Sequence, residues 1–324
     1  MKILVTGCSG FIGFHVSNRL LQLSKKIHVI GIDNLNNYYD VKLKKKRLEI
    51  LKKEKNFIFY KKDISNYKAL KKVFTLSKPD IVLNLAAQAG VRYSIKYPEK
   101  YFNSNILGFF NLIDISKTFN VKHFVYASTS SVYGNIKKFP ITEEMNTDKP
   151  LSFYAASKKC NEIIAHSYSF IHKLPTTGLR FFTVYGPYGR PDMALFKFTK
   201  NIIKNKKIDL YNFGNHIRDF TYIDYVSNAV IKVIQNIPNQ KIPYEIYNVG
   251  GSKPEPLKKF IKTLETTLKK KAKVNYMKLQ VGDVHKTHAS NKKLLKKIKL
   301  NLKPIGIKDG IKYFVNWYKA FYVN

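Results

Sequence analysis

The chain contains few of the residues on which several protein classes depend. It has two cysteines in 324 residues, Cys8 and Cys160, too few for a disulfide framework or for a zinc site built on thiolates. Its eight histidines lack carboxylate or thiol companions at ligand spacing, so we predict no metal site.

Long apolar runs are also missing. No segment approaches the roughly 18 apolar residues that a membrane-spanning helix requires. The first residues lead directly into an apolar strand, not into a charged segment followed by a signal-type apolar core. We therefore expect a cytoplasmic protein without a membrane partner.

Acidic residues are scarce compared with basic ones. The 58 Lys and Arg against 21 Asp and Glu give a formal net charge of +37, and the segment 42–47 (KLKKKR) is dense enough to attract polyanions. However, the lysines are spread along the whole chain, and no RNA- or DNA-binding motif organises them. We attribute the excess to a lysine-, isoleucine- and asparagine-rich composition and predict no specific nucleic-acid partner.

Arginine is rare among these basic residues. The six positions are Arg19, Arg47, Arg92, Arg180, Arg190 and Arg218. An arginine retained in so lysine-rich a chain indicates a place where a planar, bidentate donor is needed. We predict such roles for Arg92, Arg190 and Arg218, whereas Arg19 and Arg47 have the appearance of exposed helix surface.

The order of apolar segments predicts the fold class. The length and the 44% hydrophobic content allow a nucleotide-binding core and one smaller lobe. Expected strands near 2–6, 28–32, 57–60, 80–85, 122–127 and 177–182 alternate with expected helices near 11–24, 40–54, 66–75, 98–119 and 153–172. This alternation predicts an α/β fold with a doubly wound parallel sheet of the Rossmann type.

After Tyr185 the pattern loosens into shorter elements. We expect residues 1–185 to form a dinucleotide-binding domain that carries the catalytic residues. Residues 186–324 are expected to form a smaller C-terminal α/β lobe that mainly binds the substrate, with some exchange of chain between the two parts.

A glycine-rich turn follows the first strand. Gly7 permits the tight turn, Gly10 lets the backbone approach a pyrophosphate, and Gly13 lets the next helix pack closely. That helix begins at Phe11 and Ile12, whose unpaired N–H groups and partial positive charge favour an anion. The turn therefore predicts a dinucleotide phosphate site.

An acidic residue ends the second strand. Asp33 stands twenty residues after Gly13, where the 2′-hydroxyl of an adenosine ribose needs an acceptor. The same carboxylate would repel a 2′-phosphate. We therefore predict NAD rather than NADP as the cofactor.

The candidate catalytic residues lie on two consecutive segments. Tyr154 and Lys158 are four residues apart on one expected helix, so both side chains face the same way. The ammonium can then lower the pKa of the phenol and reach the nicotinamide ribose. Thr129 ends the fifth strand, at the edge of the sheet where ligands of open α/β folds bind. Together these residues predict a Thr-Tyr-Lys site beside NAD.

Five segments together resemble the extended short-chain dehydrogenases/reductases, and within them the nucleotide-sugar epimerases. They are 6–13 (TGCSGFIG), 33–35 (DNL), 84–92 (NLAAQAGVR), 154–158 (YAASK) and 218–224 (RDFTYID). The resemblance covers essentially the whole chain. It implies a homodimer in which the helices near 98–119 and 153–172 pair with their symmetry mates.

The resemblance also implies roles for single residues. Asp63 and Ile64 would border the adenine, and Ala86, Ala87 and Asn105 would line the cofactor. Alternatively, Asp63 caps the next helix and Asn105 satisfies backbone groups within its own helix.

On the substrate side, the resemblance implies that Arg218 binds the UDP phosphates and that Arg92 and Thr183 also contact the substrate. The positions after the catalytic threonine separate the reactions within this family. Sugar-nucleotide 4,6-dehydratases carry an acidic pair there and UDP-glucuronate decarboxylases a Glu, whereas this chain has Ser130 and Ser131. Without the acids, elimination lacks its proton donor and base, and the hydroxyls instead suit a substrate carboxylate.

The segment 185–194 (YGPYGRPDMA) resembles UDP-glucuronate 4-epimerases, in which the arginine, here Arg190, faces the C5 carboxylate of the sugar. A second interpretation is a hinge in which Asp192 caps the helix that begins at Met193. We predict NAD-dependent C4 epimerisation of a UDP-sugar, UDP-glucuronate to UDP-galacturonate, through a transient 4-keto sugar. The alternatives are a 4-epimerase of a neutral or N-acetylated UDP-hexose, a UDP-glucuronate decarboxylase and a non-enzymatic NAD sensor.

Overall fold

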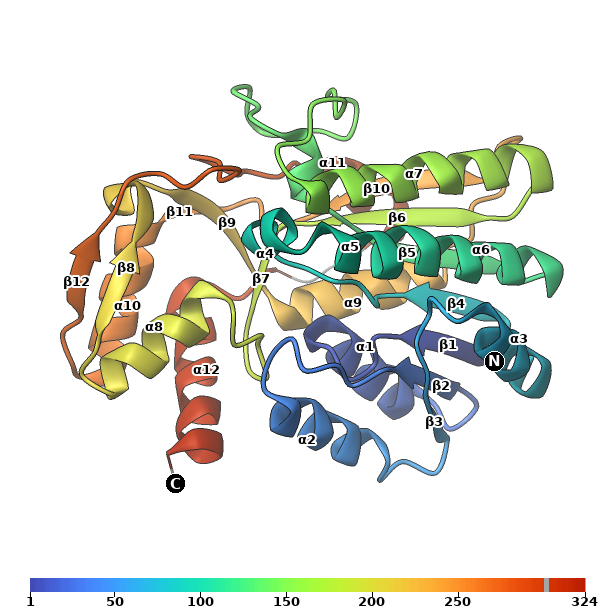
Figure 1. The fold of residues 1–324 in the computed structure, drawn as a ribbon, viewed down its shortest axis with the longest axis horizontal. Coiled ribbons are helices and arrows are strands. Elements are labelled where there is room, and N and C mark those ends of the chain that lie inside the picture. The colour runs from blue at the N-terminus through green and yellow to red at the C-terminus, as the bar shows by residue number, and fades with distance from the viewer. Residues whose placement is uncertain (300–302, 324) are drawn as a thin grey trace.

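A single parallel sheet organises most of the molecule (Figure 1). The computed structural model describes residues 1–299 and 303–323. The sheet has seven strands in the order β10-β6-β5-β4-β1-β2-β3, and every neighbouring pair is parallel. The strands are β1 (Lys2–Thr6), β2 (His28–Asp33), β3 (Phe57–Lys61), β4 (Ile81–Asn84), β5 (His123–Thr129), β6 (Thr176–Phe181) and β10 (Tyr244–Val249). The predicted Rossmann-type α/β fold is confirmed.

Helices cover both faces of this sheet, which explains why its central strands are apolar runs without alternation. One face packs against α1 (Phe11–Leu23), α2 (Val41–Leu51) and α9 (Ile223–Ile234). The other packs against α3 (Tyr67–Ser77), α6 (Gly108–Thr118) and α7 (Phe153–His172). Between β4 and α6 the chain forms α4 (Val91–Lys96), α5 (Pro98–Tyr101) and a π-helical segment (Phe102–Leu107).

The C-terminal lobe lies beyond the carboxyl ends of the strands, on the left of Figure 1. Its two small sheets have the orders β11-β9-β7 and β12-β8. Its elements are β7 (Thr183–Tyr185), α8 (Ala194–Ile203), β8 (Lys207–Leu210), β9 (Ile217–Tyr222), β11 (Pro254–Pro256), α10 (Leu257–Leu268), β12 (Lys273–Tyr276) and α12 (Ile307–Tyr322). Short 3₁₀ turns occupy Ser130–Tyr133 and Tyr211–Gly214, and α11 (Lys292–Ile298) precedes α12.

The chain crosses between the two parts more than once. After β9 it returns to the large sheet, where α9 packs against α1 and β10 pairs with β6. Conversely, β7 precedes residue 186 but pairs with β9 in a sheet of the lobe. The two parts are therefore connected at several points beside the carboxyl edge of the large sheet.

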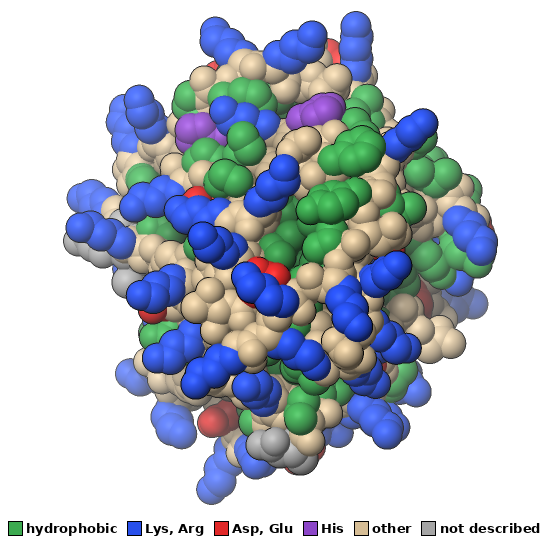
Figure 2. All heavy atoms as spheres, turned by 90° about the vertical axis from the view of Figure 1, so that its left-hand side faces the viewer, with side chains coloured by type: hydrophobic (Ala, Val, Ile, Leu, Met, Phe, Trp, Pro, Cys, Tyr) green, Lys and Arg blue, Asp and Glu red, His purple; other side chains and the backbone are tan. Residues whose placement is uncertain are grey.

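The basic side chains on the face that the C-terminal lobe presents do not form a single patch (Figure 2). Figure 2, which faces the C-terminal lobe, shows lysine and arginine side chains scattered over the whole face and apolar side chains gathered around a central hollow. Among residues 1–299 and 303–323, none of the helices has the length and apolar character that crossing a membrane requires.

Candidate active site

A cavity of about 540 Å³ lies between the carboxyl edge of the large sheet and the C-terminal lobe. Both parts of the molecule contribute to its lining. Every site residue predicted from the sequence lines it except Asn105. Parallel strands end at one edge of a sheet, and this brings residues from distant segments to one place.

The glycine turn forms one wall of the cavity. Gly7 has φ +70°, and its N–H donates to the Ile32 carbonyl at 2.7 Å. A Cβ atom on Gly7 would lie 2.8 Å from the Ala86 amide nitrogen, and one on Gly13 would collide with the Gly7 carbonyl. In the described structure no side chain caps α1 at Gly10, so its first N–H groups can bind an anion. This wall fits the diphosphate of a dinucleotide.

Asp33 lies at the end of β2 in the same cavity. Its carboxylate accepts from the N–H groups of Ser9 at 3.1 Å and Leu35 at 2.8 Å, and burial raises its pKa. Lys44, which no sequence pattern indicated, also lines the cavity. Its ammonium donates to Asn36, and burial lowers its pKa to about 8. Asp33 retains lone pairs for a ribose hydroxyl.

Asp63 and Ile64 line the cavity beyond β3. Asp63 accepts from the Asn34 amide at 2.8 Å and from the N–H and hydroxyl of Ser65. Burial acts to raise its pKa, but these hydrogen bonds outweigh burial and lower it. The helix α3 is capped by Asn66, so the alternative of a capping role for Asp63 is wrong.

Asn105 does not line the cavity, contrary to the expectation. It is buried in the π-helical segment, where its amide donates to the Gln88 carbonyl at 3.0 Å and to the Ser157 hydroxyl at 2.9 Å. Its side-chain oxygen accepts from the Gln88 N–H at 2.8 Å. Asn105 therefore fixes the loop after β4 and ties it to α7. The alternative that it satisfies backbone groups is closer to the structure, although those groups belong to a loop and not to its own helix.

The start of α7 places the catalytic pair. The Ser152 hydroxyl accepts from the Ala155 N–H and caps the helix. Tyr154 therefore lies in the first turn and Lys158 one turn deeper, on the same face. The Lys158 ammonium donates to the Ala127 carbonyl at 3.0 Å, and burial lowers its pKa to about 8.

Burial and three neighbouring residues act on the pKa of Tyr154. Burial is the largest effect and raises the pKa of the phenol, while the Thr129 hydroxyl and the Arg190 charge act to lower it. Asp192 raises it further. The Lys158 ammonium donates to the Ala127 carbonyl of β5 and is not among the groups that shift this pKa here, so its lowering effect on the phenol stays a prediction.

A buried ion pair anchors α7 to the sheet. Arg180 donates from Nε and Nη2 to the two oxygens of Glu162, both at 2.9 Å. The Ser128 hydroxyl donates to the same carboxylate at 2.6 Å. Glu162 lies one helical turn beyond Lys158, so this pair fixes the catalytic face of α7 against β5 and β6.

Arg190 is the central basic residue on the sugar side. Its Nε and Nη2 atoms donate to the two oxygens of Asp192 at 3.0 and 2.6 Å, and the Tyr38 hydroxyl donates to the same carboxylate at 3.1 Å. The predicted cap is wrong: α8 begins at Ala194, and its N-cap Met193 offers no side-chain bond. Asp192 instead fixes the guanidinium.

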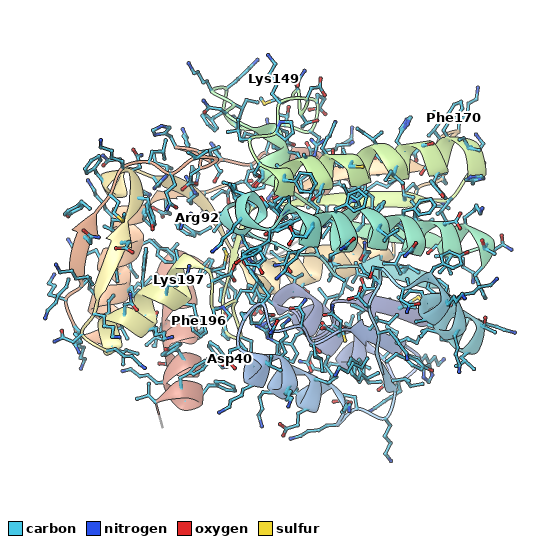
Figure 3. All side chains as sticks on the ribbon, in the orientation of Figure 1. Asp40, Arg92, Lys149, Phe170, Phe196 and Lys197 are labelled. Carbon is cyan, nitrogen blue, oxygen red and sulfur yellow. The ribbon has the colours of Figure 1, made fainter. Side chains whose placement is uncertain are left out.

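A second basic cluster surrounds Asp283 in the C-terminal lobe. Arg218 donates to it at 2.9 Å, Arg92 lies 3.9 Å from it, and His216 lies 3.5 Å from it. The Arg92 guanidinium also covers the Tyr211 ring, 4.4 Å from its centre. Figure 3 places Arg92 between the lobe and the large sheet. Arg92 and Arg218, far apart in sequence, thus share one carboxylate at the cavity wall.

The predicted hydroxyl residues line the same cavity as the two arginine clusters. Ser130 and Ser131 follow Thr129 in a 3₁₀ turn, in which the Ser131 N–H donates to the Thr129 hydroxyl at 3.2 Å. Thr183 begins β7 on the opposite segment. All four line the cavity, so they can surround one small polar group.

One prediction about the arginines is wrong. Arg47 is fully buried, not part of an exposed helix surface. It lies on the inner face of α2 together with Leu43, Leu48 and Leu51. The helical spacing of Leu43, Arg47 and Leu51 could have revealed this burial. No sequence pattern indicated Tyr38, Lys44 or His216, and Asp192 was expected only as a helix cap. The one signal for these four residues is their nearness in sequence to predicted site residues.

Metal ligands are not grouped in the described part of the chain, where no three His, Cys, Asp or Glu side chains could hold an ion together. The glycine wall, the acid at the end of β2 and the Thr-Tyr-Lys cluster define a dinucleotide-dependent enzyme of the Rossmann class.

Comparisons with known proteins identify the family. Residues 3–250 match the model of the NAD dependent epimerase/dehydratase family. The chain is 48% identical to Protein CapI of Staphylococcus aureus, over 99% of each chain. It is 39% identical to a probable UDP-glucuronate 4-epimerase of Rhizobium meliloti, over 99% of this chain and 98% of the other.

A solved structure extends the comparison to three dimensions. The UDP-glucuronic acid 4-epimerase of Bacillus cereus, in complex with UDP-glucuronic acid and NAD, superposes with a TM-score of 0.93. It is 33% identical, with 99% of this chain and 100% of that chain covered. The chain belongs to the NAD dependent epimerase/dehydratase family.

Proposed function

We propose that the protein is an NAD-dependent 4-epimerase of UDP-sugars that interconverts UDP-glucuronate and UDP-galacturonate. The observation that carries this proposal is the content of one cavity. The glycine wall, Asp33, Tyr154, the Thr129–Ser131 hydroxyls and Arg190 all line this one cavity. The likeness to proteins of that activity supports it.

The cofactor side would hold NAD through this chain's backbone and one acid. The N–H groups at the start of α1 would bind the diphosphate, and Asp33 the adenosine ribose. When bound, NAD removes a hydride from C4 of the sugar and returns it to the opposite face.

Tyr154 would manage the proton of the C4 hydroxyl. Its phenolate takes this proton as the 4-keto sugar forms and returns it after the sugar has turned about its pyrophosphate. Thr129 would hydrogen-bond the same oxygen and, together with Arg190, favours the ionised phenol. Configuration at C4 inverts without net oxidation.

The uronate introduces a side reaction. A 4-keto group next to C5, which bears the carboxylate, makes a β-keto acid that readily loses carbon dioxide. Fixed hydrogen bonds from Ser130, Ser131, Thr129 and Arg190 would hold the carboxylate out of alignment with the ketone. Asp192 strengthens this arrangement, because two of its bonds hold the guanidinium in one orientation.

One observation favours a second candidate, a 4-epimerase of neutral or N-acetylated UDP-hexoses. Because Arg190 already pairs with Asp192, its charge is largely balanced before substrate arrives. A neutral sugar would leave that pair undisturbed, whereas a carboxylate must share the guanidinium with Asp192.

Product analysis distinguishes these candidates. The purified protein is incubated separately with UDP-glucuronate and UDP-glucose, and the epimer, carbon dioxide and UDP-pentose are measured. We expect faster conversion of the uronate and no carbon dioxide. Faster conversion of UDP-glucose would establish the second candidate, and UDP-pentose from the wild type would indicate a decarboxylase.

We also propose a homodimer in the cytoplasm. Apolar side chains remain exposed on adjacent helices of the described chain, among them Phe110 on α6 and Ile163 and Phe170 on α7. Phe170 lies at the far end of α7 in Figure 3. A second copy would cover them. Light scattering at micromolar concentration tests the homodimer, and Ile163→Lys is expected to yield monomers. Cell fractionation tests the cytoplasmic location.

A further inference from the structure

Arg47 connects two parts of the cavity wall that the chain separates widely. Its Nη1 atom donates to the carbonyl of Ser9, within the glycine turn, at 2.8 Å. Its Nη2 atom donates to the carbonyls of Tyr188 at 2.5 Å and Gly189 at 3.4 Å. These two residues immediately precede Arg190. A single guanidinium thus joins the dinucleotide turn to the segment that carries the sugar-side arginine.

Arg47 has no ion-pair partner in the described part of the chain, although the Tyr39 hydroxyl accepts from its Nη1 atom at 2.8 Å and the Asp33 charge acts on it from beyond ion-pair distance. Its side chain is fully buried, and among the described residues no carboxylate oxygen lies within 4.0 Å of its nitrogens. Its Nε atom also lacks a hydrogen-bond partner within that part of the chain. A buried cation without an ion-pair partner is costly. A bound diphosphate at the start of α1 would lower this cost.

The segment before Arg190 needs such support. Tyr188 has φ +56°, a conformation that costs energy for a residue with a side chain. Three consecutive carbonyls are held from the other domain: that of Pro187 contacts His15 at 2.9 Å, and the next two accept from Arg47. The Tyr188 ring also lies 5.0 Å from the Trp317 ring of α12. These contacts fix the backbone from which Arg190 extends.

We propose that Arg47 is a positioning residue that couples the dinucleotide turn to Arg190. Its charge favours the diphosphate, and its two-sided hydrogen bonding sets the backbone ahead of Arg190. The effect of Arg47 on NAD binding and on the backbone conformation at Tyr188 does not depend on which sugar is the substrate. Its effect on the choice between sugars rests on the proposed uronate activity.

Two variants separate charge from geometry. Arg47→Met has similar volume without charge, and Arg47→Lys keeps the charge but cannot present a planar fork to both carbonyl groups. Lys46→Met is the matched control, because Lys46 is a half-exposed neighbour on α2 whose one ion-pair partner among the described residues is Glu49. We expect Arg47→Met to retain less NAD through purification, and Arg47→Lys and Lys46→Met to retain the wild-type amount.

Sugar choice is the second measurement. We expect the ratio of kcat/KM for UDP-glucuronate to that for UDP-glucose to fall about 10-fold in both Arg47 variants, the scale of one lost hydrogen bond to a charged group. When Arg190 is already replaced by Ala, the additional change Arg47→Met should leave this ratio unchanged, because Arg47 acts on sugar choice only by positioning the Arg190 side chain. An equal loss for both sugars, or the same fall in both backgrounds, would overturn the coupling.

The single tryptophan of the chain supplies a readout that needs no sugar. If Arg47 fixes the segment at Tyr188, Trp317 emission shifts in Arg47→Met and Arg47→Lys but not in Lys46→Met. Unchanged emission together with unchanged NAD retention would reject the proposal, even if the wild type proves to prefer neutral sugars. If Arg47→Met does not fold, emission and sugar choice in Arg47→Lys decide.

Discussion

The two sides of the cavity bind by different means. The cofactor side contains a glycine turn, the uncapped start of a helix and the ends of strands, so backbone N–H groups are available there to bind a phosphate. The sugar side consists of charged side chains already paired with each other, Arg190 with Asp192 and Arg218 with Asp283.

The cofactor side binds the same group, a diphosphate, in every reaction cycle, whereas the sugar side has to choose among different substrates. Backbone donors at a helix start recognise phosphate and need no rearrangement when it arrives. On the sugar side, an incoming anion must share or displace a carboxylate that already holds the arginine. Such a site discriminates through the geometry of the shared donor more than through net charge.

The largest expected effect comes from the proposed base, Tyr154. Tyr154→Phe removes the phenol oxygen but keeps the ring, and we expect turnover to fall by roughly two to four orders of magnitude, the scale of a lost general base. NAD and UDP-sugar should still bind, which calorimetry would check. Activity within tenfold of the wild type would exclude Tyr154 as the base.

Arg190→Ala tests the sugar side alone. Loss of a charge-assisted contact of about 1.5–3 kcal/mol should lower kcat/KM for both uronates about 10- to 150-fold more than for UDP-glucose, which loses only the effect of the Arg190 charge on the ionised Tyr154. The variant should also release carbon dioxide and form UDP-pentose, because the carboxylate can turn into line with the ketone. The measurement follows both sugars and carbon dioxide for wild type and variant side by side.

The amount of bound NAD serves as the control for Arg190→Ala. It should not change, since Arg190 belongs to the sugar side. An equal fall for uronate and neutral sugar would remove the distinction between the two sides and favour the neutral-sugar epimerase.

Asp33→Ala tests the cofactor side alone. Loss of one charge-assisted hydrogen bond to the ribose should weaken NAD about 10-fold. NADP should be affected less or even bind better, because it loses a repulsion. Binding titrations with both dinucleotides check this, and the ratio of uronate to neutral turnover should stay at the wild-type value. An unchanged preference for NAD over NADP would contradict the assignment of Asp33 to the adenosine ribose.

The smallest expected effect is a shift in pH dependence. The negative charge of Asp192 raises the pKa of Tyr154, so Asp192→Asn should lower that pKa. Since the reaction needs the phenolate, the acid limb of the kcat profile should move to lower pH. The neutral substrate UDP-glucose is used, because its binding does not depend on Arg190. A shift to higher pH would contradict the assigned electrostatics.

Local patterns predicted much of the cofactor side. The glycine spacing, the acid at the end of β2 and the Tyr154–Lys158 pair each depend on a strand end or a helical repeat, which neighbouring residues determine. An exception is Asn105, which faces a loop rather than the cavity.

The sequence by itself determined the alternation of strands and helices, the dinucleotide turn and the catalytic helix. Each of these depends on the spacing of apolar residues, or on the conformations open to glycine, within a few neighbouring residues. The tertiary structure alone decided which charges meet. Arg47 reaches Tyr188 across 141 positions and Arg218 reaches Asp283 across 65, and β10 joins β6 only after the chain has visited the C-terminal lobe. These contacts depend on the packing of whole elements. A buried charged group needs hydrogen-bond acceptors, and the acceptors come from segments that only the complete fold places beside it.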